Sequence, residues 1–218
     1  MRQLASKWLK TKALLRHPYT AVYIPETCLY SEEQLRMMLR RHAFVFIKPV
    51  KGGGGNGVMR VAKERKGYTC TRMENAYRFD HFKALVDGIS RLRIQRPYLI
   101  QQGIQLASIQ GRPVDYRVKV AKEGEKWIFR AVVARHARPG LVITNLCKGG
   151  TLLKGREALR MIYSQRLAIR KRREIVDLTR HCIPVLERRF PGIGQLGFDY
   201  GLDPNGRVWI LEVNTRPQ

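Results

Sequence analysis

The sequence has few acidic residues and no long apolar run. Asp and Glu together number 17 in 218 residues, against 42 Lys and Arg, which gives a formal net charge of +25. A positive field of this size attracts phosphate-rich ligands, acidic proteins and anionic polymers. No apolar stretch approaches the roughly 20 residues that cross a bilayer, so we expect no membrane partner. The first 16 residues lack the apolar segment of a secretory signal, which favours a cytoplasmic location.

Clustered cysteines and histidines are also missing. The four cysteines form no CxxC pair, and the five histidines form no HExxH motif. These patterns argue against a disulfide framework and against a zinc site, so we expect reduced thiols. The sequence contains no internal repeat, and its 44% hydrophobic composition is typical of a globular protein.

The order of predicted helices and strands indicates the α+β class. Helical spacing of Leu4, Trp8, Thr11 and Leu15 predicts a short amphipathic helix at the start of the chain. Further helices are predicted at 31–41, 79–92 and 156–189, the last interrupted near Pro184. Strands are predicted at 44–48, 58–62, 68–73, 98–101, 114–121, 127–137, 195–200 and 207–213. Because helices and strands do not alternate strictly, a parallel α/β fold is disfavoured.

A glycine-rich loop follows the predicted strand 44–48. Residues 52–57 read GGGGNG, so Gly53, Gly54, Gly55, Asn56 and Gly57 follow a first glycine. A β-like stretch comes next, and no GK[ST] is present, so neither a dinucleotide fingerprint nor a P-loop fits. A strand, a glycine loop and a second strand are typical of a flap whose N–H groups close over phosphates. The alternative is a mobile hairpin tip without a ligand.

A lysine and two arginines add candidate phosphate contacts. Lys48 precedes the glycine loop and supplies a point charge. Asp115 and Arg117 share one face of a predicted strand, and Arg135 comes from its partner strand. Two guanidinium groups suit a γ-phosphate or an acyl phosphate, although each alone would be a surface ion pair.

The last predicted hairpin carries three oxygen-bearing side chains: Asp199, Glu212 and Asn214. If residues 203–206 close a two- or four-residue loop, Asp199 lies opposite Ile210 and diagonal to Glu212, with the oxygens within about 7–8 Å on one face. Close carboxylates repel each other unless cations hold them. Hard oxygen ligands on a phosphate-binding protein predict Mg²⁺. The alternative is a sheet rim where the acids pair with arginines.

A basic run, RKRR at residues 170–173, lies inside the predicted helix 156–189. Such a run is usually a solvated helix face, and no aromatic residues alternate with it to stack bases. Binding of an anionic polymer stays an alternative.

The order of these motifs resembles the ATP-grasp superfamily over residues 25–216. The segments that carry the resemblance are FIKP at 46–49, YLIQQGI at 98–104, DYR at 115–117, NLCKGG at 145–150, GFD at 197–199 and LEVNTRP at 211–217. Within the superfamily the sequence is most similar to the YheC/YheD group of endospore coat-associated proteins.

The resemblance implies an ATP-grasp fold of two α+β lobes that clamp a nucleotide, without the usual N-terminal substrate domain. It divides the chain into an amphipathic segment at 1–24, a lobe with flap and hinge at 25–104, and a lobe with the metal-binding hairpin at 105–218.

The resemblance also implies roles for the individual residues. Lys48 and the glycine flap would contact phosphates, and Arg117 and Arg135 would stabilise the transferred phosphoryl group. One or two Mg²⁺ ions, for which Mn²⁺ substitutes, would bind Asp199, Glu212 and Asn214. The remaining implied nucleotide contacts, adenine at the hinge among them, are Gln101, Gln102, Gly103, Ile104, Asp115 and Asn145.

The function implied is an ATP-dependent ligase that joins a carboxylate to an amine or thiol through an acyl phosphate. The sequence identifies neither substrate. The alternatives are a non-catalytic scaffold in spore coat assembly, which would place the protein at the spore, and a basic protein that binds an anionic polymer or an acidic protein.

Overall fold

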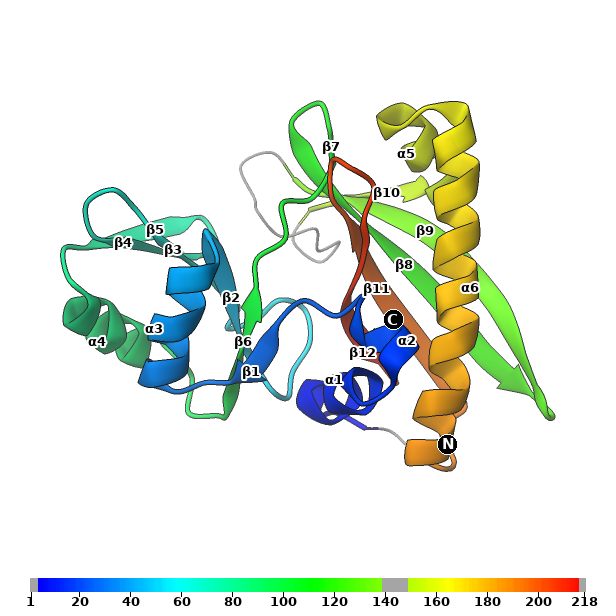
Figure 1. Cartoon of the computed structure of the whole chain (residues 1–218), viewed down its shortest axis with the longest axis horizontal. Helices are drawn as coiled ribbons and strands as arrows, with labels where there is room; N and C mark the ends of the chain where they lie inside the picture. Colours follow the sequence, from blue (N-terminus) through cyan, green and yellow to red (C-terminus); the bar gives the residue numbers. More distant parts are fainter. Residues whose placement is uncertain (1–3, 139–148, 216–218) are drawn as a thin grey trace. The chain divides into compact units, whose positions relative to one another are not determined.

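The computed structural model describes residues 4–138 and 149–215 (Figure 1). The chain forms two compact units, one of Pro25–Gly103 and one of the residues before and after it. The first 24 residues thus pack with the C-terminal half, and the division into three functional segments stays a prediction. No helix within the described ranges is both long and apolar enough to span a membrane.

The unit Pro25–Gly103 is a six-stranded antiparallel sheet with two helices. Its strand order is β1-β6-β2-β3-β4-β5. Alternation along β2 directs Val45 and Ile47 into a core with Leu35 and Met38 of α3. The hydroxyl of Ser31 caps α3 by accepting a hydrogen bond from the backbone N–H of Gln34. The elements are β1 Thr27–Leu29, α3 Glu32–Arg41, β2 Phe44–Pro49, β3 Met59–Lys63, β4 Tyr68–Arg72, β5 Asn75–Phe79, α4 Phe82–Leu92 and β6 Tyr98–Gln102.

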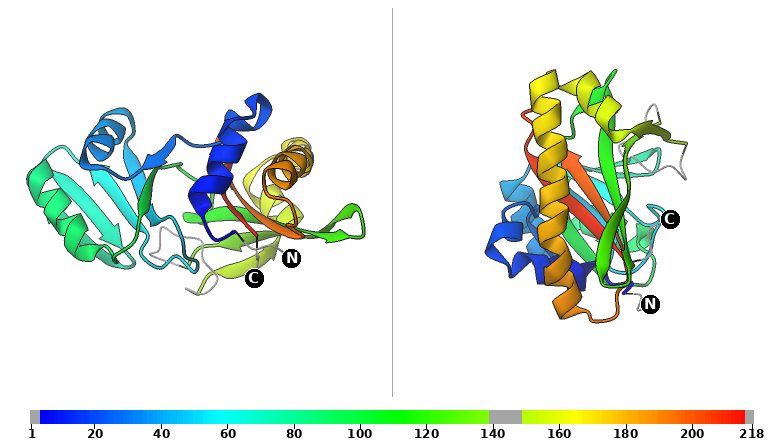
Figure 2. Two further views of the ribbon diagram at one scale, coloured as in Figure 1. Left: turned by 90° about the horizontal axis from the view of Figure 1, so that it is seen from below. Right: turned by 90° about the vertical axis from the view of Figure 1, so that its right-hand side faces the viewer.

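The other unit is built on an antiparallel sheet with the order β10-β9-β8-β11-β12, and β7 pairs with β8. Figure 2 shows α6 running along one face of this sheet. The two antiparallel sheets, each with its own helices, confirm the predicted α+β class. The elements are α1 Lys7–Leu15, α2 Pro18–Ala21, β7 Ser108–Ile109, β8 Arg112–Glu123, β9 Lys126–His136, β10 Thr151–Lys154, α5 Gly155–Ile162, α6 Gln165–Arg189, β11 Gln195–Leu202 and β12 Val208–Asn214.

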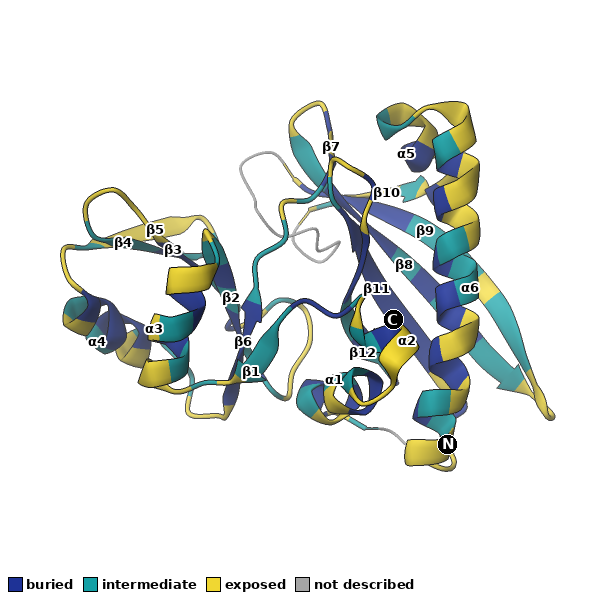
Figure 3. Cartoon of the chain, viewed as in Figure 1, coloured by how far each residue is buried: buried dark blue, intermediate teal, exposed yellow. Residues whose placement is uncertain are grey.

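The two faces of the second sheet differ in chemistry. Tyr116 on β8 and Phe198 and Tyr200 on β11 are buried in the core, together with Ile175 and Leu178 of α6. Figure 3 shows the strands β8 and β11 largely in the colour of buried residues. Because neighbouring residues of a strand point to opposite faces, the residues between them form a second, charged face. This charged face carries the predicted site residues of β8, β9, β11 and β12.

The predicted interruption near Pro184 is wrong. Helix α6 continues through Pro184 to Arg189, and the break lies earlier, between α5 and α6. There the hydroxyl of Ser164 caps α6 by accepting from the N–H of Leu167. Pro184 is exposed, so water can satisfy the carbonyl that loses its N–H partner.

The predicted N-terminal helix exists, but its buried stripe is different. Lys7, Lys10, Ala13 and Leu14 are buried, whereas the four predicted residues are only partly buried. Lysines tolerate this position because each finds an oxygen, and Lys10 Nζ donates to the carbonyl of Leu4 at 2.6 Å. Hydrophobic periodicity places only apolar residues on the buried side of a helix, so it could not predict that Lys7 and Lys10 are buried.

Residues 4–24 cover the outer edge of β12. The backbone N–H of Ile210 donates to the carbonyl of Tyr23 at 2.7 Å. At the other end of the strand, the hydroxyl of Thr215 accepts from the N–H of Leu4 at 2.8 Å. An uncovered edge would leave such groups unpaired, so the segment completes the sheet.

Candidate functional site

The register of the last hairpin places two carboxylates side by side. Asp199 on β11 lies directly opposite Glu212 on β12, and Tyr200 lies opposite Ile210. The predicted pairing of Asp199 with Ile210 is therefore wrong. Leu202 pairs with Val208, which leaves a five-residue loop, and a further shift falls between Asp199 and Tyr200. Sequence reasoning assumed an even loop and a regular ladder.

Asn214 completes the predicted oxygen set. It follows Glu212 by two residues on the same strand and lies opposite Gly197. The two residues therefore share one face with Asp199, as expected from alternation. The role of these three residues as metal ligands stays a prediction.

Asp199 is held by two arginines. Its Oδ1 accepts from Arg117 Nε at 2.8 Å, and its Oδ2 accepts from Arg117 Nη2 at 2.9 Å. Arg135 Nη2 lies 3.1 Å from Oδ2 of the same carboxylate. Burial alone would raise the pKa of Asp199, but the guanidinium groups of Arg135 and Arg117 outweigh it and lower the pKa below its ordinary value. Asp199 is therefore a stable anion.

Arg135 also binds Asp115, which lies opposite it in the sheet. Arg135 Nε donates to Asp115 Oδ1 at 2.7 Å, and Nη2 donates to Oδ2. Burial opposes the charge on Arg135, but Asp199 and Asp115 raise its pKa above the ordinary value. Charges of opposite sign thus alternate from Asp115 through Arg135 and Asp199 to Arg117, which is itself partly exposed; we call these four residues the buried row. Each side chain is held firmly in this row, because moving it away would leave the charge of its neighbour buried and unpaired.

Lys7, from the N-terminal helix, contacts Glu212 and was missed by the sequence analysis. Its Nζ lies 2.6 Å from Glu212 Oε1, with side-chain exposures of 10% and 21%. The neighbouring Lys10 has its pKa lowered to about 8, chiefly by burial and also by Lys7, against the opposing effect of Glu212. The two residues of the Lys7–Glu212 pair are 205 positions apart, and no motif connects them.

Lys119 is a second residue missed by the sequence analysis. It pairs with Gly197 in the sheet, so alternation places it on the charged face two residues after Arg117. Its position two residues after Arg117 in the same predicted strand was the signal in the sequence.

The donor chemistry of this face fits Mg²⁺, which prefers carboxylate and amide oxygens. Within residues 4–138 and 149–215, no cluster of three or more His, Cys, Asp or Glu residues forms a metal site. A metal here would therefore use Asp199 and Glu212 with the amide oxygen of Asn214 and further oxygens from a ligand. Both carboxylates hold cationic side chains, so a metal would compete with them.

The unit Pro25–Gly103 holds the predicted phosphate-binding lysine. Lys48 on β2 donates to Gln101 Oε1 at 2.6 Å, and Gln101 Nε2 donates to the hydroxyl of Thr27 at 3.1 Å. Gln101 is buried. Its side chain therefore orients Lys48, while a contact of Gln101 with a nucleotide stays a prediction.

The glycine flap joins β2 to β3. Residues 52–54 and Asn56 are exposed, whereas Gly57 is buried. Gly57 has φ +76°, a backbone conformation that favours glycine. A Cβ there would also lie 2.8 Å from the hydroxyl of Tyr98, which is closer than van der Waals contact. The buried end anchors the loop, and the exposed backbone of Gly53 and Gly54, with the half-exposed Gly55, suits the predicted contact with phosphates.

The hinge residues pack tightly at the end of β6. The N–H of Gln102 donates to the carbonyl of Glu26 at 2.8 Å, and the N–H of Gly103 donates to the carbonyl of Phe44 at 2.9 Å. A Cβ at Gly103 would lie 2.1 Å from the Phe44 ring, so any other residue would force this ring to move. Ile104 begins the other compact unit, and Asn145 lies outside the described residues.

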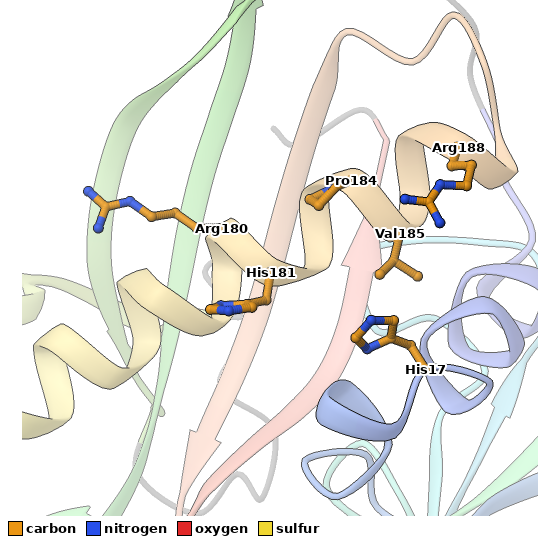
Figure 4. A pocket seen from close by; sticks show the side chains of 6 residues that line it. All are labelled: His17, Arg180, His181, Pro184, Val185 and Arg188. Carbon is orange, nitrogen blue, oxygen red and sulfur yellow. The ribbon is translucent and has the colours of Figure 1, made fainter.

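A cavity of about 270 Å³ lies between α6 and His17, and none of the predicted site residues lines it. In Figure 4, Val185 and Arg188 point from α6 toward His17, whereas Arg180 points away. The full lining is His17, Arg180, His181, Pro184, Val185 and Arg188. This surface is basic, and hydrophobic patterning gave no signal for it.

A family model described as YheC/D-like ATP-grasp matches residues 2–218. Endospore coat-associated protein YheD of Bacillus subtilis is 31% identical over 223 residues, which cover 97% of this chain and 48% of YheD. Endospore coat-associated protein YheC of the same organism is 25% identical over 222 residues, which cover 99% of this chain and 61% of YheC. The chain therefore spans about half of YheD and three-fifths of YheC.

Solved structures share the fold at low sequence identity. N5-carboxyaminoimidazole synthase from Aspergillus clavatus, solved with ADP, matches with a TM-score of 0.59 at 11% identity, over 100% of this chain and 46% of that one. D-alanine–D-alanine ligase from Coxiella burnetii matches with a TM-score of 0.56 at 14% identity, over 98% and 48%. The predicted ATP-grasp fold is confirmed.

Proposed function

Because the chain belongs to the YheC/D-like ATP-grasp family, we propose that it binds Mg-ATP and transfers the γ-phosphoryl group to a carboxylate. The product would be an acyl phosphate, which an amine or thiol then attacks. The observation that carries this proposal is the charged face, where four adjacent strands bring two arginines and three carboxylates together. Two of the solved structures with this fold are a synthase bound to ADP and a ligase by name, which supports the reaction class.

The proposed roles follow from charge. Arg117 and Arg135 bind oxygens of the transferred phosphoryl group, since a planar guanidinium grips two oxygens at once. Lys48 and the exposed flap backbone contact phosphate oxygens. Asp199 and Glu212, with Asn214, would hold Mg²⁺, which when bound neutralises phosphate charge.

In the proposed reaction, a carboxylate oxygen of the substrate attacks the γ-phosphorus, and the bond to the β-phosphate oxygen breaks with release of ADP. The nitrogen or sulfur nucleophile then attacks the acyl carbon and displaces phosphate. No covalent bond between protein and substrate forms in this reaction. The rate enhancement therefore comes from positioning the reactants and from neutralising the phosphate charge. Arginines anchored on a buried row are suited to this task because they are oriented before the substrate arrives.

The test is to replace Glu212 by Gln, which keeps the shape and removes the charge. Calorimetry should show that Mg-ATP binds at least about tenfold more weakly, since losses even in the outer shell of a metal site cost this much. Glu125→Gln is the matched control, because Glu125 has a side-chain exposure of 98% and lies on the hairpin tip between β8 and β9. Equal binding by wild type and Glu212→Gln would refute the site. Release of ADP that depends on one acceptor would exclude a purely structural scaffold.

We also propose that the outer face of α6 binds an extended polyanion. The predicted basic run 170–173 does not itself form this surface, because Lys171 is buried and lies 2.8 Å from Glu174. Instead, exposed arginines recur at helical spacing along one side of the helix, which we call the arginine stripe. Its members are Arg166, Arg170, Arg173, Arg180 and Arg188.

The length and composition of the arginine stripe favour an extended ligand. Residues 166–188 span about 33 Å at the helical rise of 1.5 Å per residue. Asp177 interrupts the positive charge and pairs with Arg180 at 3.0 Å. At its C-terminal end, the stripe reaches the basic cavity of Figure 4, where Arg188 faces His17. Repeated guanidinium groups suit carboxylates or phosphates at regular spacing.

A charge-matched comparison tests this second proposal. Replacing Arg166, Arg170 and Arg173 by Gln should lower the salt concentration that elutes the protein from heparin. The control replaces Lys63, Arg65 and Lys66 by Gln, three exposed cations of the other compact unit. Equal shifts for both triple variants would mean that only net charge matters and would refute a site on α6.

A further inference from the structure

The ion pair between Lys7 and Glu212 has a consequence for the proposed metal site. Asp199 is paired with Arg117 and Glu212 with Lys7, so both carboxylates of the donor set already have a cation. Bringing a divalent ion onto this face adds two positive charges to a partly buried set whose two carboxylates are already paired. The ion would bind weakly unless a resident cation leaves a carboxylate.

The resident cations differ in how they are attached. Arg117 and Arg135 belong to the paired strands β8 and β9, and both also take part in the buried row with Asp199. Lys7 is instead the first residue of α1, outside the sheet. The turn before it is held by hydrogen bonds of Leu4 with Thr215 and of Lys10 with Leu4. Movement of Lys7 therefore disturbs a helix end, whereas movement of Arg117 or Arg135 disturbs the buried row.

We propose that Lys7 is a tethered cation that occupies Glu212 until a metal ion replaces it, so that metal binding and docking of the first turn of α1 compete. This inference rests on the proposed function, since it takes Glu212 as a metal ligand. Competition for one carboxylate is a coupling between two sites, and it acts equally in both directions. Metal binding thus loosens residues 4–10, and a firmly docked helix weakens metal binding.

The first measurement is Mn²⁺ binding without nucleotide, followed by electron paramagnetic resonance. Lys7→Gln should bind Mn²⁺ about tenfold more tightly than wild type, within the usual range of coupling between two sites. Lys12→Gln is the matched control, because Lys12 is an exposed lysine of the same helix, and it should bind as wild type does. Lys7→Arg keeps the cation and should also stay near wild type.

The second measurement is hydrogen exchange of the backbone amides of residues 4–10. Saturating Mn²⁺ should speed exchange there in wild type, but not in Glu212→Gln. Adding Glu212→Gln to Lys7→Gln should remove the gain in Mn²⁺ affinity, because that gain acts through this carboxylate.

The outcomes separate the two proposals. If wild type binds Mg-ATP through Glu212 but Lys7→Gln leaves the Mn²⁺ affinity unchanged, the competition is refuted and the nucleotide site stands. If Lys7→Gln gains Mn²⁺ affinity through Glu212 but the protein does not bind Mg-ATP, the competition stands and the proposed function fails. If no variant binds Mn²⁺ through Glu212, the competition is refuted together with the metal site.

Discussion

Asp115 and Tyr116 are neighbours on β8, yet they lie on opposite faces of one sheet. Tyr116 is buried among apolar side chains in the core cluster that α6 shares, whereas Asp115 is equally buried beside a guanidinium group. The face with Tyr116 is stabilised by apolar packing, and the face with Asp115 is stabilised by pairing of opposite charges. Apolar packing contains no titrating group and no ion-binding group, whereas a balance of charges responds directly to pH and to a bound ion. The proposed binding of Mg-ATP is on the charged face, which is the face that can respond to pH and to a bound ion.

The largest effect is expected on the apolar face. Phe198→Ala removes a ring that is fully buried and should lower the free energy of unfolding by about 3–5 kcal/mol, from lost burial and the cavity left behind. Urea denaturation gives this value. The loss should be the same at pH 7 and pH 4.5, because no charge is involved. Ile169→Ala, on the exposed side of α6, should change stability by no more than about 0.5 kcal/mol.

On the charged face, a loss of similar size should depend on pH. Arg135→Met leaves Asp115 and Asp199 without the cation they share and should cost about 3 kcal/mol at pH 7. At pH 3 the carboxylates can protonate, so the cost should fall. Arg130→Met, an exposed position on the same strand, should cost less than about 1 kcal/mol at either pH. An identical cost of Arg135→Met at both pH values would mean that packing, not charge, holds this face.

Asp199 itself should make the wild-type protein sensitive to acid. Its pKa is lower in the folded state than the ordinary value of 3.8, because Arg135 and Arg117 outweigh burial. A carboxyl group of this kind stabilises the folded state above its unfolded pKa, and the stabilisation is lost as the pH falls through the folded pKa. The stability difference between wild type and Asp199→Asn should therefore be largest near pH 7 and shrink below about pH 4. A difference that stays constant from pH 7 to pH 3 would contradict the lowered pKa.

The smallest effect tests a buried polar contact between α6 and the apolar face of the sheet. The hydroxyl groups of Thr179 and Tyr200 lie 2.7 Å apart and are buried. Thr179→Val keeps the shape and should cost about 1–2 kcal/mol, since the hydroxyl of Tyr200 loses its partner. Combining it with Tyr200→Phe should cost less than the sum of the single changes, and strict additivity would show that the hydrogen bond contributes nothing.

The sequence predicted much of the fold because alternation and motif order are local signals. The positions of the charged face on β8, β9 and β11 follow from alternation alone. The pairing of Asp199 was predicted wrongly, because a five-residue loop and a register shift each move the ladder by one residue. The predicted interruption near Pro184 is absent, because burial of the opposite side of α6 outweighs the loss of one hydrogen bond.

The contact of Lys7 with Glu212 lay beyond sequence reasoning for a different reason. Hydrophobic periodicity selects apolar stripes, so it pointed to Leu4, Trp8, Thr11 and Leu15 and gave no place to Lys7 and Lys10. The lysines are buried because oxygen partners exist at distant positions, and a single sequence carries no record of such pairs. The spacing of Lys7, Lys10 and Leu14, which puts them on one side of the helix, was the local sign that the two lysines face the protein.

A crystal structure with Mg²⁺ and a non-hydrolysable ATP analogue tests the central claim most directly, namely that the charged face binds a metal and nucleotide. The account predicts Mg²⁺ at about 2.0–2.1 Å from oxygens of Asp199 and Glu212, with Lys7 displaced from Glu212. It also predicts Arg117 or Arg135 on the terminal phosphate. A bound nucleotide with no metal at this face, with Lys7 still on Glu212 and with neither Arg117 nor Arg135 on the terminal phosphate, would contradict it.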